Sequence, residues 1–438
     1  MAAPQDLPPI DPGLLPPVDE VPRPWLAGYP RGVPVDYAFP DVPLTRLLDD
    51  AARDFPELPA LRVRGSTVDF ATLLDQVDRC AAGLLALGVQ PGSRVAAVLL
   101  QPAAAAVVTF ATWRIGAVLV PIDPAQPGAH LKEQVRAADC VALVTAHASV
   151  VGVAVGVVPH VVLVRGREWL PWRQRLGAWR PRRRRRRDAP IDFADLLAEQ
   201  PLSLAPDHGG DVPAVVLPGD GAGDVVLSAA NLLAASFQVR LWIPDFQAGQ
   251  ELVVSGHRPT SIHGLVRGLL FPVLSGATTI AADDDHELVE ALREQSATIV
   301  VAEGRTVAAL AVQARRDADR LRSVRAVLVT PDGAQPADAA AVEGLTGARV
   351  RVATGPTAGC GFTHAAAVYG SAVEWAAVVP VPATTALVVD DEAGAVEAGA
   401  TGRLAVAGPQ VAAGGWLVSD LVVTAGTDGA VRAVATTD

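Results

Sequence analysis

The chain has 438 residues and a formal net charge of -11, and half of its residues are apolar while only 5% are aromatic. This length allows two or three domains around a large core, the composition favours a layered α/β protein, and the acidic balance argues against nucleic-acid binding, which needs a basic surface. The three cysteines, Cys80, Cys140 and Cys360, have no paired spacing, which excludes a disulfide framework or a cysteine metal site and fits a reducing cytosol.

The first part of the chain is rich in proline, and residues 1–43 are expected to form an extended arm on the surface. This stretch has neither a basic region nor an apolar core, so it lacks the pattern of a signal peptide. Residues 44–55 predict an amphipathic helix. The following "ALRVRGSTVDF" predicts a hairpin around Gly65-Ser66.

Strands alternate with helices along residues 44–211, the first predicted α/β subdomain. An amphipathic helix begins after Asp69 and closes at Gly88, and the strand "SRVAAVLL", the helix "AAAAVVTFATWRIG" and the strand "AVLVPID" follow. This alternation predicts a mostly parallel sheet covered by helices on both faces. Residues 141–164 are long enough to cross a membrane. Their β-branched clusters and Pro159 instead favour two buried strands joined by a short connection.

The second half of the chain repeats the alternation. Residues 212–380 contain the apolar runs "PAVVL", "ELVVS", "ATTIA", "ATIVVA" and "RAVLVT", which predict the strands of a second α/β subdomain. Residues 381–438 change to short strands separated by glycine turns, which predicts a small barrel-like β subdomain.

A glycine-spaced turn lies in "VVLPGDGAGDVVLSAANLL", residues 215–233, between an apolar strand and the start of a helix. Backbone N–H groups of such a turn can hold a phosphate. Residues 212–227 contain no Ser, Thr or Lys, however, and Asp220 and Asp224 add negative charge. A hydrogen bond to a charged group contributes roughly 1.5–3 kcal/mol, so the missing hydroxyl and ammonium groups outweigh what the bare amides retain. We therefore expect an ordinary strand-to-helix turn.

These segments resemble the adenylate-forming, AMP-binding superfamily, in particular bacterial long-chain fatty acyl-CoA synthetases. The resemblance is carried by "RPWLAGYPRGVPVDYAFPDVPLTRLLDDAARDFPELPALR" and "AAGLLALGVQPGSRVAAVLLQ…GAVLVPIDPAQPGAHL", and it covers the chain from Arg23 onward. It implies the large N-terminal domain of that fold. Such enzymes join a carboxylate to AMP using ATP and Mg²⁺ and then pass the acyl group to coenzyme A. A small C-terminal domain supplies a catalytic lysine, and we expect that domain to be absent here.

The resemblance also implies that the nucleotide contacts are degenerate. The remaining nucleotide-binding candidates are Gly219, Gly221, Gly223, Gly333, Ala334, Gly355 and Thr357. Thr354 stands where the family has the aromatic residue that stacks on adenine, and Ala358 stands where it has the magnesium-binding glutamate. Magnesium needs oxygen ligands such as carboxylates, and alanine offers none.

The acyl-pocket candidates implied by the resemblance are Ser261, His263 and Gly264, with Ser261 at the position of the family's histidine. The only lysine, Lys132, matches neither lysine of the family. We therefore predict no catalytic residue and no metal ligand, and we expect no bound cofactor.

A tryptophan- and arginine-rich insertion occupies about residues 167–189. Tryptophans beside arginines suit a membrane interface with anionic lipid, and this gives membrane-contact candidates: Trp169, Trp172, Trp179, Arg182 and Arg183. The alternatives are a solvated loop, because six consecutive arginines repel one another, or a contact with another macromolecule.

Three functions stay open. The first is a non-catalytic homologue that binds an acyl chain or a nucleotide, or that forms a homo- or hetero-oligomer with an active synthetase. The second is a working ligase that uses ATP or AMP with Mg²⁺ and takes its missing domain from another chain. The third is a scaffold on a membrane surface. The expected location is cytoplasmic, with peripheral contact at the inner membrane face as the alternative.

Overall fold

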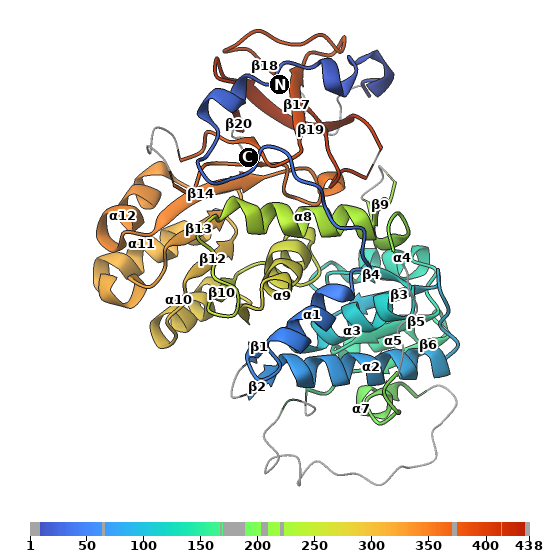
Figure 1. Cartoon of the computed structure of the whole chain (residues 1–438). Helices are drawn as coiled ribbons and strands as arrows, with labels where there is room; N and C mark the ends of the chain where they lie inside the picture. The colour runs from blue at the N-terminus through green and yellow to red at the C-terminus, as the bar shows by residue number, and fades with distance from the viewer. Residues whose placement is uncertain are drawn as a thin grey trace.

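The structure is a computed structural model, and it describes residues 9–63, 66–166, 169, 189–202, 209–219, 223–369, 375–412 and 414–433. Two mixed, mostly parallel β-sheets and a smaller antiparallel sheet form the body of the molecule, with helices between and around them (Figure 1). The predicted fold class, α/β with two layered subdomains and a small β unit, is confirmed.

The first sheet has seven strands in the order β7-β6-β5-β3-β4-β8-β9. Its strands are β3 (Arg94–Val98), β4 (Val118–Pro121), β5 (Ala142–Thr145), β6 (His160–Leu163), β7 (Ile191–Asp192), β8 (Pro213–Leu217) and β9 (Val225–Ser228). Its helices are α2 (Phe70–Ala86), α3 (Pro102–Arg114), α4 (Gly128–Ala137), α5 (Ala148–Ala154) and α7 (Phe193–Leu196). Only β9 runs antiparallel to its neighbour. The central strands are apolar throughout because helices cover both faces.

The second sheet has nine strands in the order β16-β15-β14-β13-β12-β10-β11-β1-β2. Its strands are β1 (Pro59–Val63), β2 (Ser66–Asp69), β10 (Leu252–Ser255), β11 (Thr278–Ala281), β12 (Ile299–Ala302), β13 (Ala326–Val329), β14 (Arg349–Thr354), β15 (His364–Ala365) and β16 (Val379–Pro380). Its helices are α1 (Arg46–Asp54), α8 (Ala229–Trp242), the π-helix η7 (Gly264–Leu270), α9 (Phe271–Leu274), α10 (Asp285–Glu294), α11 (Thr306–Arg316) and α12 (Pro336–Thr346).

The chain crosses between the two sheets twice. β1 pairs in parallel with β11 of the second sheet, with Leu61 opposite Thr279. β8 pairs in parallel with β4 of the first sheet, with Leu119 opposite Val215. Sheet membership therefore does not follow the predicted ranges 44–211 and 212–380, because each range lends a hairpin to the sheet of the other.

The helices pack on the two sheets through three main hydrophobic cores. The largest core lies between the two sheets and includes residues of α1, α2, α3, α8 and η7. The outer face of the first sheet packs on α4 and α5. The outer face of the second sheet packs on α10, α11, α12 and the third sheet.

The third sheet is antiparallel, with β17 (Thr385–Val389), β18 (Thr401–Ala407), β19 (Leu417–Ala425) and β20 (Val431–Ala433) in sequence order. The proline-rich arm lies on it in three short 3-10 turns, η2 (Pro12–Leu14), η3 (Val18–Glu20) and η4 (Pro24–Gly28). Arm residues Ile10 and Leu15 share a small core with this sheet, and the indole of Trp416 donates a 2.7 Å hydrogen bond to the carbonyl of Pro16. The arm is therefore packed against the fold rather than only laid over it.

Residues 141–164 form two buried strands, β5 and β6, as the pattern predicts. The connection is not short, because β5 and β6 are parallel neighbours and such strands need a crossover; α5 supplies it. The helix α2 begins after Asp69 as predicted, and the Asp69 carboxylate caps it by accepting the amide N–H of Thr72 at 2.6 Å. No helix in the described part of the chain is long and apolar enough to cross a membrane.

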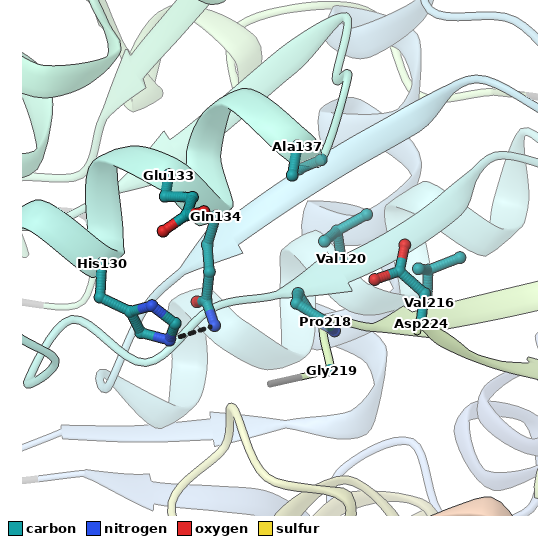
Figure 2. Close-up of a pocket in the computed structure, with 10 residues that line it drawn as sticks. Val120, His130, Glu133, Gln134, Ala137, Val216, Pro218, Gly219 and Asp224 are labelled. Carbon is teal, nitrogen blue, oxygen red and sulfur yellow. Dashed lines mark hydrogen bonds between the residues drawn. The ribbon is translucent and has the colours of Figure 1, made fainter. Parts of the chain in front are cut away.

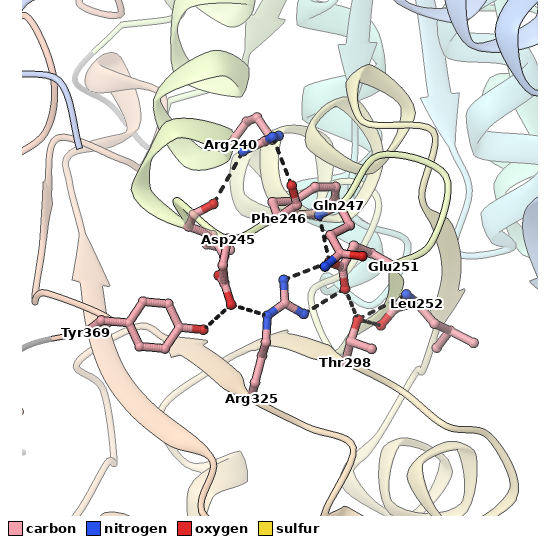
Figure 3. A network of polar contacts seen from close by, with 10 residues as sticks. Arg240, Asp245, Phe246, Gln247, Glu251, Leu252, Thr298, Arg325 and Tyr369 are labelled. Carbon is pink, nitrogen blue, oxygen red and sulfur yellow. Dashed lines mark hydrogen bonds and ion pairs between the residues drawn. The ribbon is translucent and has the colours of Figure 1, made fainter. Parts of the chain in front are cut away.

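An ion-pair network fastens the amino ends of three parallel strands in the second sheet (Figure 3). Glu251 precedes β10, Thr298 precedes β12 and Arg325 precedes β13, and the Glu251 carboxylate accepts hydrogen bonds from both other side chains. Arg325 also bonds to Asp245, which accepts the hydroxyl hydrogen of Tyr369 at 2.9 Å. The network fixes the strand register at the edge of the sheet opposite to the candidate site.

Candidate functional site

The carboxyl ends of β13 and β14 bring four of the predicted nucleotide-binding residues to one edge of the second sheet. Gly333 and Ala334 follow β13, and Gly355 and Thr357 follow β14, its parallel neighbour. Ligands of open α/β sheets bind at this edge. Both positions also require glycine for the fold itself. A Cβ on Gly355 would lie 2.7 Å from the amide nitrogen of Thr363, and Gly333 has the left-handed backbone angle φ +69°.

The glycine turn approaches the same edge from the first sheet. β9, which leaves the turn, contacts the 3-10 turn η9 (Thr357–Gly359). Gly223 has φ +89°, and Gly219 lies directly beside the carbonyl of Gly223, so the ends of the turn are close together. Gly221 lies outside the described residues, together with Asp220 and Ala222. Contact with η9 is thus made by β9, the strand after the turn, while the centre of the turn is not described.

The position implied for magnesium is occupied by backbone and a methyl group. The carbonyl of Ala358 accepts the amide N–H of Ala412 at 2.8 Å, which joins η9 to the loop after β18. Thr357 beside it is exposed. Within the described ranges, no group of three or more His, Cys, Asp or Glu side chains is placed to hold a metal ion.

Two of the acyl-pocket candidates serve a local turn. The hydroxyl of Ser261 donates to the carbonyl of Arg258 at 2.9 Å and accepts the amide N–H of Gly264 at 3.0 Å. A Cβ on Gly264 would overlap the carbonyl of Arg258, so this position needs glycine. These bonds cap the start of η7, and they use the serine hydroxyl both as a donor and as an acceptor.

His263, the third candidate, lies in a buried group with His257 and Arg267 that the sequence pattern did not predict. Its ring lies 5.3 Å from that of His257, and Nδ1 of His263 is buried although the residue as a whole is partly exposed. Burial and the charge of Arg267 lower the pKa of His263 to about 3 and also lower the pKa of His257. Both rings are therefore neutral at pH 7.

Arg267 fills the space between η7, the end of β14 and the turn at Gly361. The side chain is completely buried, its Nη2 donates to the carbonyls of Ala353 at 3.1 Å and Gly361 at 2.6 Å, and its guanidinium stacks over Phe362 at 5.2 Å. Burial lowers its pKa to about 9, so it stays protonated at pH 7. The sequence carried one signal for it, a charged residue inside the apolar run "GLVRGLLF".

A separate cavity of about 510 Å³ opens on the outer face of the first sheet (Figure 2). Its lining comes from α4, β4, β8 and the residues around the glycine turn: Val120, His130, Glu133, Gln134, Ala137, Ala138, Val216, Pro218, Gly219 and Asp224. Gly219 is the only predicted site residue among them. Nothing in the sequence signals this cavity, because α4 and the residues around the glycine turn are far apart in the chain.

Trp169 is buried rather than exposed at an interface. Its ring packs against Phe193 at 5.9 Å, and its Nε1 donates to the side-chain oxygen of Gln76 at 3.1 Å. Trp169 is therefore not accessible for the predicted membrane contact, because its side chain is part of the hydrophobic core of the first subdomain. The other membrane-contact candidates, Trp172, Trp179, Arg182 and Arg183, lie outside the described residues.

Known proteins resemble this chain over nearly all of its length. A long-chain-fatty-acid–CoA ligase of Bacillus subtilis is 22% identical over 418 residues, which span 90% of this chain and 74% of that protein. The phosphinothricin tripeptide synthetase PhsC of Streptomyces viridochromogenes is 36% identical, but only over 99 residues, or 9% of its length.

Solved structures share the fold. A benzoate CoA ligase from Burkholderia xenovorans superposes with a TM-score of 0.75 at 20% identity, over 89% of this chain and 79% of that one. A long-chain-fatty-acid–CoA ligase from Archaeoglobus fulgidus gives a TM-score of 0.73 at 16% identity, over 93% and 86% of the two chains. The family model described as AMP-binding enzyme matches residues 48–197 and 224–416. With most of its length matched by that model, this chain belongs to the AMP-binding enzyme family.

Proposed function

We propose that this chain is a non-catalytic member of the AMP-binding enzymes, which binds an acyl or nucleotide ligand without forming an acyl-adenylate. One observation carries the proposal. At the carboxyl end of β14, where the family resemblance implies an adenine-stacking aromatic and a magnesium carboxylate, this chain has Thr354 and Ala358. A bound triphosphate with its metal needs both kinds of group.

Charge compensation argues in the same direction. Lys132, the only lysine of the sequence, is exposed on α4, which packs on the outer face of the first sheet and not at the edge where Thr357 lies. Removing a single charge-stabilising donor from an active site can lower the rate about 10²–10³-fold. Several simultaneous losses would leave no measurable adenylation.

The space beside the acyl-pocket candidates supports the loss of catalysis, and it places any acyl ligand elsewhere than beside Arg267. Arg267 occupies it with a charged, hydrogen-bonded side chain, and an apolar acyl chain entering there would have to displace it. Exposing the two carbonyls that Arg267 satisfies would leave them without partners, at a cost of about 1–3 kcal/mol each.

The test is ATP–pyrophosphate exchange with the purified 438-residue chain, Mg²⁺ and fatty acids of graded length, together with calorimetric titration of ATP and of acyl-adenylate. We expect no exchange above the protein-free background, whatever the acid. The matched variant is Thr354→Tyr/Ala358→Glu, which returns both implied groups and should tighten Mg·ATP binding over the parent chain. Acyl-adenylate formed by the parent chain alone would refute the proposal.

A second candidate, a ligase completed by another chain, draws on the exposed Thr357 and on the contact between β9 and η9. It predicts that exchange appears when an active synthetase of the same family is added and then falls with Thr357→Val. The non-catalytic proposal predicts that the added synthetase contributes only its own exchange activity, unchanged by that substitution.

A further inference from the structure

Four arginine side chains are buried in the described part of the chain, and one of them has no acidic partner. Three form ion pairs with carboxylates: Arg114 with Asp49 and Asp78, Arg351 with Glu343, and Arg403 with Asp420. Arg267 is 0% exposed and forms no ion pair with any carboxylate that the structure describes. Asp332 acts on its charge from a distance, without a hydrogen bond. Arg267 therefore carries a buried positive charge that the described residues do not balance.

Most N–H groups of Arg267 also lack an acceptor. Nη2 donates to the carbonyls of Ala353 and Gly361, whereas Nε and Nη1 are buried and have no hydrogen-bond partner among the described residues. Two ring nitrogens of the same buried group are in the same state, Nε2 of His257 and Nδ1 of His263. A neutral imidazole can carry its N–H on either nitrogen, so both rings can offer a donor.

Gly361 brings the guanidinium and the ring of His263 to one place. Its carbonyl accepts the hydrogen bond from Arg267 at 2.6 Å, and a Cβ on Gly361 would lie 2.5 Å from Nδ1 of His263. Glycine at this position, which has φ +65°, therefore leaves Nδ1 uncovered by a side chain. His263 is partly exposed as a residue, so the group lies near the surface of the molecule. Because all four nitrogen atoms are buried, a ligand that reaches them must be small.

The missing partner has to carry a negative charge. A buried ion without a counter-charge is costly, and a guanidinium stays protonated in proteins. Buried water can accept the N–H hydrogens, but it leaves the charge unbalanced. From this combination we propose that Arg267 binds one free monovalent anion, no larger than formate, through its N–H groups that have no partner, next to the rings of His257 and His263.

This inference does not depend on the proposed function. The loss of adenylation is argued from Thr354 and Ala358 at the carboxyl end of β14, and an anion at Arg267 uses neither position. The anion concerns the stability of the fold around η7. A chain that fails to bind the anion can still lack catalysis, and an active ligase can still bind it.

The experiment is urea denaturation of the full chain while chloride or formate replaces gluconate at constant ionic strength, which keeps the screening of the acidic surface the same. Gluconate is too large for the group and is the reference anion. If only the folded chain binds one anion, each tenfold increase of that anion above its dissociation constant should raise the folded-to-unfolded ratio about tenfold. The chloride series tests a halide and the formate series a small carboxylate, so the two sources are told apart.

The variant Arg267→Gln removes the charge and should abolish this dependence on the anion. The matched control is Arg403→Gln, another buried arginine, whose partner Asp420 has a side chain that is 68% exposed. The control can be less stable than the parent chain, but it should keep the same dependence on the anion. Should Arg267→Gln not fold, His263→Phe removes one ring nitrogen and should raise the anion concentration needed for half of the effect severalfold.

Three results would overturn the proposal. The first is a parent chain whose stability is the same in chloride, formate and gluconate, which would mean that water alone fills the group. The second is an equal dependence in Arg267→Gln and the parent chain, which would mean a general effect of the salt. The third is a loss of the dependence in Arg403→Gln, which would place the anion elsewhere.

Discussion

The guanidinium of Arg325 makes two parallel hydrogen bonds to the carboxylate of Glu251, from Nη1 to Oε2 at 2.7 Å and from Nη2 to Oε1 at 2.8 Å. The Glu251 side chain is 5% exposed and that of Arg325 is 25% exposed. Removing one partner of such a pair leaves a charge in a poorly hydrated place. We expect Glu251→Gln to lower the free energy of unfolding by roughly 3 kcal/mol, measured by urea denaturation.

The control for this prediction is Asp319→Asn, which breaks the pair with Arg322, where both side chains are more than 70% exposed. Exposed pairs contribute little, so this variant should change stability by less than about 0.5 kcal/mol. Equal effects of the two substitutions would show that the network in Figure 3 does not stabilise the second sheet.

Two helical glycines predict opposite responses to alanine. A Cβ on Gly83 of α2 would lie 2.8 Å from Cβ and 2.9 Å from Cα of Leu196, whereas a Cβ on Gly344 of α12 would have no neighbour within 4 Å. Gly344→Ala should stabilise the protein by about 0.5–1 kcal/mol through helix propensity. Gly83→Ala should destabilise it by roughly 1–3 kcal/mol through overpacking between α2 and α7. Urea midpoints that move in the same direction would contradict this.

Buried histidines make stability depend on pH. Burial lowers the pKa of His364 to about 3, and burial together with the charge of Arg267 lowers that of His263 to about 3, against 6.5 in the unfolded chain. Between these values only the unfolded chain binds the proton. The free energy of unfolding should therefore be constant above about pH 7 and fall by about 1.4 kcal/mol per pH unit for each group as the pH drops from 6.5 towards 3.

Replacing one of these histidines tests whether its protonation in the unfolded chain causes the predicted loss of stability at low pH. His364→Gln removes one titrating group, so urea midpoints between pH 6.5 and 4.5 should decline less steeply than in the parent chain. A steeper decline, or an unchanged one, would show that His364 is already protonated in the fold.

The cysteines should be inert while the protein is folded. All three are buried, and burial raises the pKa of Cys140 to about 12 and those of Cys80 and Cys360 above their usual value. Thiolates are the reactive form. At pH 8 we expect no reaction with an aromatic disulfide reagent in native buffer and three equivalents in denaturant. Prompt modification of one thiol in native buffer would place that cysteine at the surface.

The hydrophobic pattern alone predicted most of the helices and strands, but it did not predict which strands pair with one another in the sheets. The apolar runs of β10, β12 and β13 are buried strands as expected, because both faces of a covered parallel sheet select such residues. Nothing in "ALRVRGSTVDF" encodes that β1 lies beside β11, since pairing across sheets depends on residues far along the chain. The strand β19 has no clear pattern of its own, because "LVSDLVVTA" mixes polar and apolar residues without strict alternation.

The candidate site likewise could be predicted where it depends on local sequence and not where it depends on contacts between distant segments. Gly333 follows a predicted strand, but β14, the strand before Gly355 and Thr357, was not among the predicted apolar runs because "RVRVAT" alternates charged and apolar residues. The apolar run around Arg267 signals that it is buried, but its partners could not be anticipated, because they are carbonyls of two other segments, Ala353 and Gly361. Trp169 was expected at a membrane surface on the strength of its basic surroundings, yet Phe193 and Gln76 hold it in the core.

The hydrogen bond from Trp416 to Pro16 joins residues 400 positions apart, and this bears on the order of events at the ribosome. The arm is made before the sheet that covers Ile10 and Leu15, which follows about 400 residues later in the chain. At roughly 5–20 residues per second, the nascent arm waits roughly 20–80 s for its partner. During that delay its apolar side chains are accessible to chaperones and proteases, so a stalled or prematurely released polypeptide would be cleared before it could assemble.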